Sequence, residues 1–298
     1  MKSKFAFAWL AAFLLATACA WAQPAPSAGD DRMVSVAWLS AHIKDPKLVL
    51  LYVGPKAEFD KEHIAGSQFI TLQDISTPQD MSGNALSMEL PSAEQLKSVF
   101  EKRGISNDSR IVVYYSQESV SPSTRVIWTL NYLGMGDRTS LLEGGVNAWK
   151  AAGNPVTAEV VTAVPGQLTP QVNRDAFADA SYVLGHLHQS SVAIIDARSP
   201  RDFGGIAGRV PGSANLPIER ISLSDRAALQ ELFRAAGVKP GSQVVSYCYI
   251  GIRATEIWFA ARLLGYDARM YDGAWEEWSR RADLPVEVAP EQKKRIVN

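Results

Sequence analysis

Cysteine is nearly absent from this chain of 298 residues, which contains only Cys19 and Cys248. Cys19 falls in an N-terminal segment typical of an export signal: two lysines precede an uncharged apolar run over residues 5–18, and Ala-Trp-Ala ends at Ala22. We expect cleavage after Ala22 and a periplasmic or secreted protein, the alternative being a membrane or lipid anchor, the latter at Cys19. Cleavage leaves Cys248 as the sole thiol, which excludes an internal disulfide and requires another reason for a cysteine in an oxidising compartment.

Excess charge and histidine are also lacking. Thirty Lys and Arg residues balance 31 Asp and Glu, for a formal net charge of −1, so neither nucleic acid nor stable membrane insertion after signal cleavage is expected. Of the four histidines, His186 and His188 are two apart on a predicted helix and so point to different sides. We therefore expect no metal site. Hydrophobic residues at 47% and charged residues at 20% are typical of a globular protein.

An internal repeat predicts two similar domains. In each copy an amphipathic helix ends at a glycine and leads through a polar turn to a β-rich run: residues 92–104 lead to 111–114, and residues 224–237 lead to 244–247. The first of these helices begins with a capping box, and the glycines mark where the two helices end.

The order of elements indicates an α/β fold. Short apolar strands alternate with helices in both copies, which favours a mostly parallel sheet flanked by helices in each domain. We place the first domain at 32–156, a linker at 157–169 and the second domain at 170–290.

Cys248 lies at the turn between the second β-rich run and an apolar helix over residues 254–264. Successive backbone N–H groups and the N-terminus of a helix attract an anion there, and Gly251 permits a backbone conformation that a side chain hinders. Such surroundings stabilise a thiolate and make it a nucleophile. Arg253 adds a forked cationic donor for an anionic substrate. The turn thus predicts a catalytic Cys248, with substrate bound by Arg253 and by the loop residues Tyr249, Ile250, Gly251 and Ile252.

The spacing within this loop favours sulfur over phosphate. Cysteine phosphatases carry the arginine six positions after the cysteine, which here is Ala254. The shorter ring from Cys248 to Arg253 suits a single sulfur atom better than a phosphoryl group.

Four motifs of the second half resemble those of a rhodanese domain. Residues 196–200 (Asp-Ala-Arg-Ser-Pro) and 210–217 resemble its opening signature, and residues 248–253 and 271–278 resemble its active-site loop and closing motif. The similarity extends over both halves, as in tandem-domain thiosulfate and 3-mercaptopyruvate sulfurtransferases. It implies that Cys248 forms a persulfide and that Arg198 binds the anionic end of the substrate, with Asp196 and Asp272 in support.

The resemblance also implies the partners. We expect a small anionic sulfur donor, a thiol or cyanide acceptor, no cofactor and a monomer. Vertebrate-type rhodaneses carry a lysine where this chain has Ile250, and mercaptopyruvate enzymes lack a cation such as Arg253, so thiosulfate is the favoured donor. The alternatives are a 3-mercaptopyruvate sulfurtransferase, a non-catalytic sulfur carrier and, further away, a cysteine phosphatase.

The first domain lacks the corresponding chemistry. Counting from the strand aligns Cys248 with Tyr115, and counting from the helix aligns it with Gln117; Tyr52 and Gly54 stand in place of Asp196 and Arg198. Ser116 lies between the two aligned positions, but no histidine is near it in sequence to act as a base. We expect the first domain to be inactive and to form one wall of the cleft.

Overall fold

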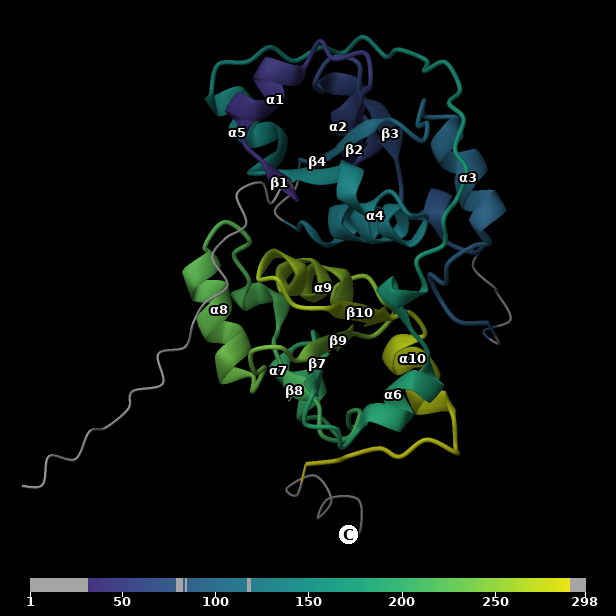
Figure 1. Ribbon diagram of the computed structural model, residues 1–298, viewed down its shortest axis with the longest axis vertical. Coiled ribbons are helices and arrows are strands. Elements are labelled where there is room, and N and C mark those ends of the chain that lie inside the picture. Colours follow the sequence, from purple (N-terminus) through teal and green to yellow (C-terminus); the bar gives the residue numbers. More distant parts are fainter. Residues whose placement is uncertain (1–31, 79–82, 84, 117–118, 290–298) are drawn as a thin grey trace, which may run out of the picture.

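The computed structural model describes residues 32–78, 83, 85–116 and 119–289. The predicted export signal, its cleavage after Ala22 and the lipid-anchor alternative at Cys19 lie outside the described residues. The chain forms two α/β domains, each with a five-stranded sheet (Figure 1). Every strand pair in both sheets is parallel. The predicted fold class is confirmed.

In the first domain the strand order is β1-β5-β4-β2-β3. Its strands are β1 (Met33–Val34), β2 (Leu48–Val53), β3 (Gln68–Ile70), β4 (Arg110–Tyr115) and β5 (Thr139–Leu142). Its helices are α1 (Val36–His42), α2 (Lys56–Lys61), α3 (Ala93–Glu101), α4 (Ser121–Tyr132) and α5 (Gly145–Ala151), with short 3-10 turns at Gln73–Ile75 and Gly136–Arg138.

The second domain repeats this order as β6-β10-β9-β7-β8. Its strands are β6 (Phe177–Ala178), β7 (Val192–Asp196), β8 (Ala214–Asn215), β9 (Gln243–Tyr247) and β10 (Ala268–Tyr271). Its helices are α6 (Ala180–His186), α7 (Pro200–Phe203), α8 (Arg226–Ala235), α9 (Ala254–Leu263) and α10 (Ala274–Arg280), with 3-10 turns at Arg174–Ala176 and Ile218–Arg220.

Strand residues alternate between two buried faces. In β2, Leu51 and Val53 belong to the core under α3 and α4, whereas Leu50 and Tyr52 belong to the core under α1, α2 and α5. A strand covered on both faces needs a continuous apolar run, which is what β2 carries. The predicted helix starts and ends are also present: Ser92 and Gln95 form the capping box of α3, and Gly237 follows α8 with a φ of 83°.

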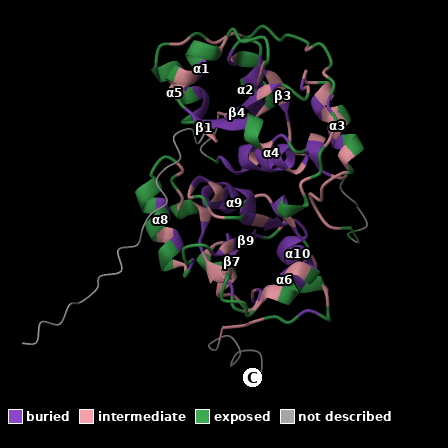
Figure 2. Cartoon of the chain, in the orientation of Figure 1, coloured by how far each residue is buried: buried purple, intermediate pink, exposed green. Residues whose placement is uncertain are grey.

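Helices α4 and α9 join the two domains. They lie side by side between the two sheets (Figure 1) and are buried along most of their length (Figure 2). One hydrophobic cluster runs from the first domain through both helices into the second. Hydrogen bonds tie the helices together at both ends: Thr124 to Thr255 at 2.9 Å, and Arg262 to Asn131 at 3.2 Å. In the described part of the chain, no helix has the length and apolar character needed to cross a membrane.

The connection between the domains follows the first domain before it crosses. Thr157 forms an antiparallel bridge with His63, and Gly166 N–H donates to the carbonyl of Glu101 at 2.8 Å. Further along, Gln171 N–H donates to the carbonyl at the end of α4. These bonds hold the connection against the surface of the first domain as far as the start of the second sheet.

Candidate active site

Cys248 directly follows β9 and is 2% exposed, with no disulfide partner. Parallel strands end at the same edge of a sheet, where α/β proteins carry their sites. Six residues, 248–253, separate the last residue of β9 from the first residue of α9. Gly251 adopts a φ of 79° in this loop, in the left-handed region that favours glycine.

Within the described part of the protein, backbone carbonyls of the loop are hydrogen-bonded, whereas the backbone N–H groups that follow Cys248 are not. Its carbonyls point into the protein: that of Cys248 accepts from Trp275 N–H at 2.9 Å, and that of Tyr249 accepts from Glu276 N–H at 3.0 Å. The N–H groups of residues 249–253 have no acceptor among the described residues. Consecutive unpaired N–H groups next to the N-terminus of a helix are a backbone arrangement that favours a bound anion, and here they directly follow the thiol.

A cavity of about 620 Å3 opens onto this loop. From the second domain it is lined by Asp202 and by six residues of the predicted site: Arg198, Cys248, Tyr249, Ile250, Ile252 and Arg253. From the first domain it is lined by Ser119, Ser121 and Pro122. The structure therefore brings the predicted nucleophile and both predicted arginines to one cleft between the domains. The sequence predicted that the first domain forms a wall, but not which residues form it.

Arg198 lines this cavity and is largely buried, with 4% exposure. Its Nε lies 3.0 Å from both carboxylate oxygens of Asp196, and its Nη2 donates to Asp196 at 2.7 Å and to the carbonyl of Gly208 at 2.9 Å. The guanidinium also lies over the ring of Trp275, 4.5 Å from its centre. Burial alone lowers the pKa of Arg198, but the hydrogen bonds and charge of Asp196 raise it above its ordinary value. Asp196 thus orients a permanently charged arginine, whose Nη1 takes no part in these bonds.

Arg253 stands at the open side of the cavity. Its side chain is 47% exposed and pairs with Glu219 at 3.2 Å. Tyr249, next to the cysteine, is 57% exposed. Because an exposed ion pair is well screened by water, Arg253 supplies a weaker and more adaptable cation than Arg198.

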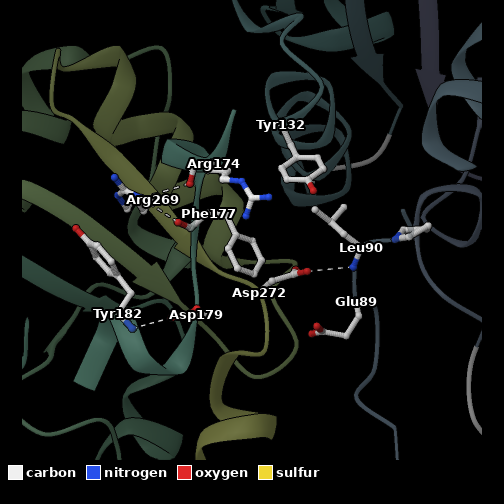
Figure 3. Close-up of a pocket in the computed structure, with 10 residues that line it drawn as sticks. Glu89, Leu90, Tyr132, Arg174, Phe177, Asp179, Tyr182, Arg269 and Asp272 are labelled. Atoms are coloured by element: carbon white, nitrogen blue, oxygen red, sulfur yellow. Dashed lines mark hydrogen bonds between the residues drawn. The ribbon is translucent and has the colours of Figure 1, made fainter. Parts of the chain in front are cut away.

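Besides Asp196, two residues of the predicted site do not line this cavity: Gly251, which is part of the loop, and Asp272, which follows β10. Asp272 is buried and pairs with Arg125 of α4 at 2.6 Å. It lines a different cavity of about 520 Å3 between the domains (Figure 3). A Cβ atom at Gly251 would lie 3.1 Å from Arg125 Nη1 and from the backbone oxygen of Asp272. Arg125 was not predicted from the sequence, because its contact with the loop depends on how α4 docks against α9.

The corresponding turn of the first domain is filled by other side chains. Tyr52 donates to Ser116 at 2.7 Å, and Ser116 donates to Glu58. The Nδ1 and Nε2 atoms of His63 are both bonded to backbone carbonyls, so this histidine is not the base that a serine nucleophile needs. Gln117 lies outside the described residues.

No metal cluster accompanies the site. Within residues 32–78, 83, 85–116 and 119–289, no three His, Cys, Asp or Glu side chains are grouped so as to hold an ion. His186 bonds instead to the carbonyl of Tyr182 at 2.7 Å and stacks on its ring.

Comparison with known proteins agrees with this geometry. The sequence model of the rhodanese-like domain family matches residues 35–152 and again residues 179–281 of this chain. The chain is 29% identical over 272 residues to a thiosulfate sulfurtransferase of Azotobacter vinelandii, covering 86% of this chain and 97% of the relative. It is 29% identical over 281 residues to the sulfur carrier protein TtuD of Thermus thermophilus, covering 85% and 95%.

The fold is shared with solved structures as well. SseA of Escherichia coli, described as a 3-mercaptopyruvate sulfotransferase with the rhodanese fold, superposes with a TM-score of 0.72 at 24% identity, covering 82% of this chain and 98% of SseA. Two matches to one family model, in two domains of the same topology, place both halves of the molecule in that family. The chain belongs to the rhodanese-like domain family and carries two copies of the domain.

Proposed function

We propose that this protein is a sulfurtransferase that moves sulfane sulfur from thiosulfate to a thiol or cyanide acceptor through a persulfide on Cys248. The observation that carries the proposal is the buried thiol of Cys248 beside five consecutive N–H groups with no acceptor in the described chain. The names of the relatives, thiosulfate sulfurtransferase among them, support sulfur transfer as the reaction class. The choice of thiosulfate rests on the two arginines that line the cavity.

In the first half-reaction the Cys248 thiolate attacks the outer sulfur of thiosulfate. A bond forms between Cys248 Sγ and that sulfur, the sulfur–sulfur bond of thiosulfate breaks, and sulfite leaves with the electron pair. Arg198 and Arg253 hold the sulfonate end. The N–H groups of the loop and the N-terminus of α9 stabilise the negative charge left on the persulfide.

In the second half-reaction the acceptor attacks the outer sulfur of the persulfide. With cyanide, a carbon–sulfur bond forms, the persulfide bond breaks, and thiocyanate leaves as the thiolate is regenerated. A thiolate acceptor reacts in the same way and leaves as a persulfide. Donor and acceptor use the same atom in turn, so we expect ping-pong kinetics.

The direct test is Cys248→Ser, assayed as thiocyanate formation from thiosulfate and cyanide. We expect no turnover above background, whereas Cys19→Ser, the control at the other cysteine, retains full activity. Full sulfur transfer by Cys248→Ser would refute the proposal. Hydrolysis of an aryl phosphate by the wild-type protein would instead favour a phosphatase, and a higher kcat/KM with 3-mercaptopyruvate would change the donor.

A second candidate is a sulfur carrier, favoured by the name of the relative from Thermus thermophilus. A carrier takes up one sulfur atom per chain but turns over slowly. Comparing stoichiometric sulfur uptake with steady-state turnover in the same preparation separates the two functions, because only an enzyme shows both.

We further propose that the mature protein acts outside the cytoplasm and begins after Ala22. The support is the sequence pattern of residues 1–22, described above. N-terminal sequencing of protein recovered from the periplasm or medium tests this, and an intact N-terminus on cytoplasmic protein would contradict it.

A further inference from the structure

Two strained backbone positions lie at the domain interface, one in each domain. Of the described residues, two other than glycine have a φ in the left-handed region: Met88 at 61° and Ala274 at 52°. Such positions are energetically unfavourable and persist only where the surrounding contacts hold them. Met88 belongs to the first domain and Ala274 to the second. Both lie beside the same ion pair, that of Arg125 and Asp272.

Arg125 reaches from the first domain to the catalytic loop of the second. Its side chain is fully buried on α4. Nη1 donates to Asp272 Oδ1 at 2.6 Å and to the carbonyl oxygen of Gly251 at 3.4 Å, while Nη2 donates to the carbonyl of Met88 at 2.6 Å. One guanidinium thus joins a strained segment of the first domain to two residues that flank the active site.

The same segment of the first domain holds Asp272 from its other side. Asp272 Oδ2 accepts from Leu90 N–H at 3.0 Å (Figure 3). Nearby, Glu276 at the start of α10 accepts from Ser87 N–H at 2.8 Å. Since Trp275 and Glu276 in turn donate to the carbonyls of Cys248 and Tyr249, residues 87–90 and Arg125 together support the loop from behind.

We propose that Arg125 is a positioning residue through which the first domain fixes the conformation of the Cys248 loop, an inference that rests on Cys248 being the reactive thiol of the proposed function. In a trans peptide the C=O and N–H groups point in opposite directions. With the Gly251 carbonyl held toward Arg125, the N–H of Ile252 is turned away from Arg125, toward the side on which Ile252 lines the cavity. Glycine at 251 leaves this peptide easy to rotate once the bond is lost.

We expect Arg125 to act by holding the Cys248 loop in place rather than by its charge. The guanidinium and the Asp272 carboxylate are 2.6 Å apart and largely cancel each other at the thiol. Removing Arg125 leaves Asp272 buried without its partner, which is strongly destabilising for such a pair. The inactive domain is then part of the catalytic machinery, although it contributes no reacting group.

The test measures the reactivity of the thiol itself. The rate of Cys248 alkylation by iodoacetamide is followed against pH in the full chain carrying Arg125→Met, Arg125→Lys or Asp272→Asn. For Arg125→Met we expect the midpoint of the profile to move up by about one pH unit and sulfur transfer to fall about tenfold. Arg125→Lys keeps the charge but loses the fork, so it moves the midpoint in the same direction by less.

Arg262→Met is the matched control. It removes a hydrogen bond between the same two helices, to Asn131, but Arg262 does not touch the loop, and we expect a wild-type profile. Asp272→Asn removes a negative charge, which by charge alone would move the midpoint down, but it also weakens the bond that holds Arg125 in place. If Arg125 acts by position we expect an upward shift, and this variant decides the question if Arg125→Met does not fold. The inference is overturned if the folded Arg125 and Asp272 variants keep the wild-type profile, or if Arg262→Met shifts it equally. If the profile shifts as expected but the wild-type protein transfers no sulfur, the proposed function fails and the positioning role stands.

Discussion

The two domains place the same scaffold around different chemistry. In the first, Tyr114 accepts from Ile64 N–H and donates to Ser67; in the second, Tyr247 accepts from Val210 N–H and is bonded to Ser213. The strand ends therefore correspond, and Tyr115 stands where the second domain has Cys248. The comparison teaches that the fold is maintained by one set of residues and the predicted site by another, so a rhodanese-like domain keeps its architecture without a cysteine at this position.

The first domain also lacks room for an arginine at the place that corresponds to Arg198. Gly54 occupies the place of Arg198, and a Cβ atom there would lie 2.7 Å from Ser116 Oγ and 2.8 Å from the Tyr52 hydroxyl. Tyr52 stands where Asp196 orients the arginine in the second domain. An arginine does not fit at position 54 without displacing both side chains.

The largest loss of sulfur transfer is expected when Cys248 is replaced, even if a cysteine is placed in the first domain instead. Cys248→Ser should lower sulfur transfer by about 10⁴-fold or more. Adding Ser116→Cys to that variant should not restore it, because the new thiol has no arginine like Arg198 beside it. Thiocyanate formation from thiosulfate and cyanide measures both. Recovery of even a few per cent of wild-type activity by the double variant would show that the two turns differ less than their geometry indicates.

The next effect concerns the arginine that the first domain lacks. Arg198→Lys keeps the charge but loses the fork that Asp196 orients, and we expect kcat/KM for thiosulfate to fall roughly 10–100-fold. Arg201→Ala, at an exposed arginine of α7, three residues after Arg198, is the control and should change kcat/KM less than about twofold. Equal losses in the two variants would mean that general positive charge, rather than an oriented guanidinium, binds the donor.

A smaller effect is expected at the exposed cation. Arg253→Met should lower kcat/KM for thiosulfate only a few-fold, since Arg253 is half exposed and already paired with Glu219. The loss should shrink further as salt is added, because exposed charges are screened. Steady-state rates at low and high ionic strength check this. A loss as large as that of Arg198→Lys, independent of salt, would contradict the ranking of the two arginines.

The smallest effect concerns stability and pH. Glu256 occupies on α9 the position that Arg125 occupies on α4, counted from the Leu-Gly that follows each helix, and it accepts from Ser121 at 2.6 Å. Burial, with the charge of Glu219 adding to it, raises the pKa of Glu256 to about 7, although the Ser121 bond and Arg253 oppose the rise. The folded-state pKa exceeds the unfolded one, so ionisation destabilises the fold as pH rises from about 4 through about 7.

Glu256→Gln removes that ionisation. We expect its Tm to approach that of the wild type near pH 5 and to exceed it by about 2–4 °C at pH 8. Thermal unfolding across this pH range measures the difference. A gap that stays constant with pH would show that the carboxyl does not titrate in the folded protein.

Much of the fold was predictable because its determinants are local. The capping box of α3, the glycines after α3 and α8, and the apolar runs of β4 and β9 are each specified within a few residues. The repeat then implied two domains of one topology. The strand–turn–helix position of Cys248 followed from the same local pattern.

What escaped prediction depends on the docking of one domain against the other. Asp272 was expected only to support the site, and its pairing with Arg125 requires α4 and α9 to lie side by side. In the sequence, Glu256 looks like any acidic residue in the first turn of a helix. Only the contact with Ser121 of the first domain shows that its carboxyl group is buried. The residues of the first domain that line the cavity beside Cys248 were not predicted either, because their position there also depends on how the domains dock.

The measurement that bears most directly on the central claim is the intact mass of the protein after treatment with thiosulfate and removal of excess reagent. We predict that the wild-type chain gains the mass of one sulfur atom, that cyanide removes it again, and that Cys248→Ser gains nothing. An unchanged mass in the wild type, or an equal gain in Cys248→Ser, would contradict the assignment of sulfur transfer to Cys248.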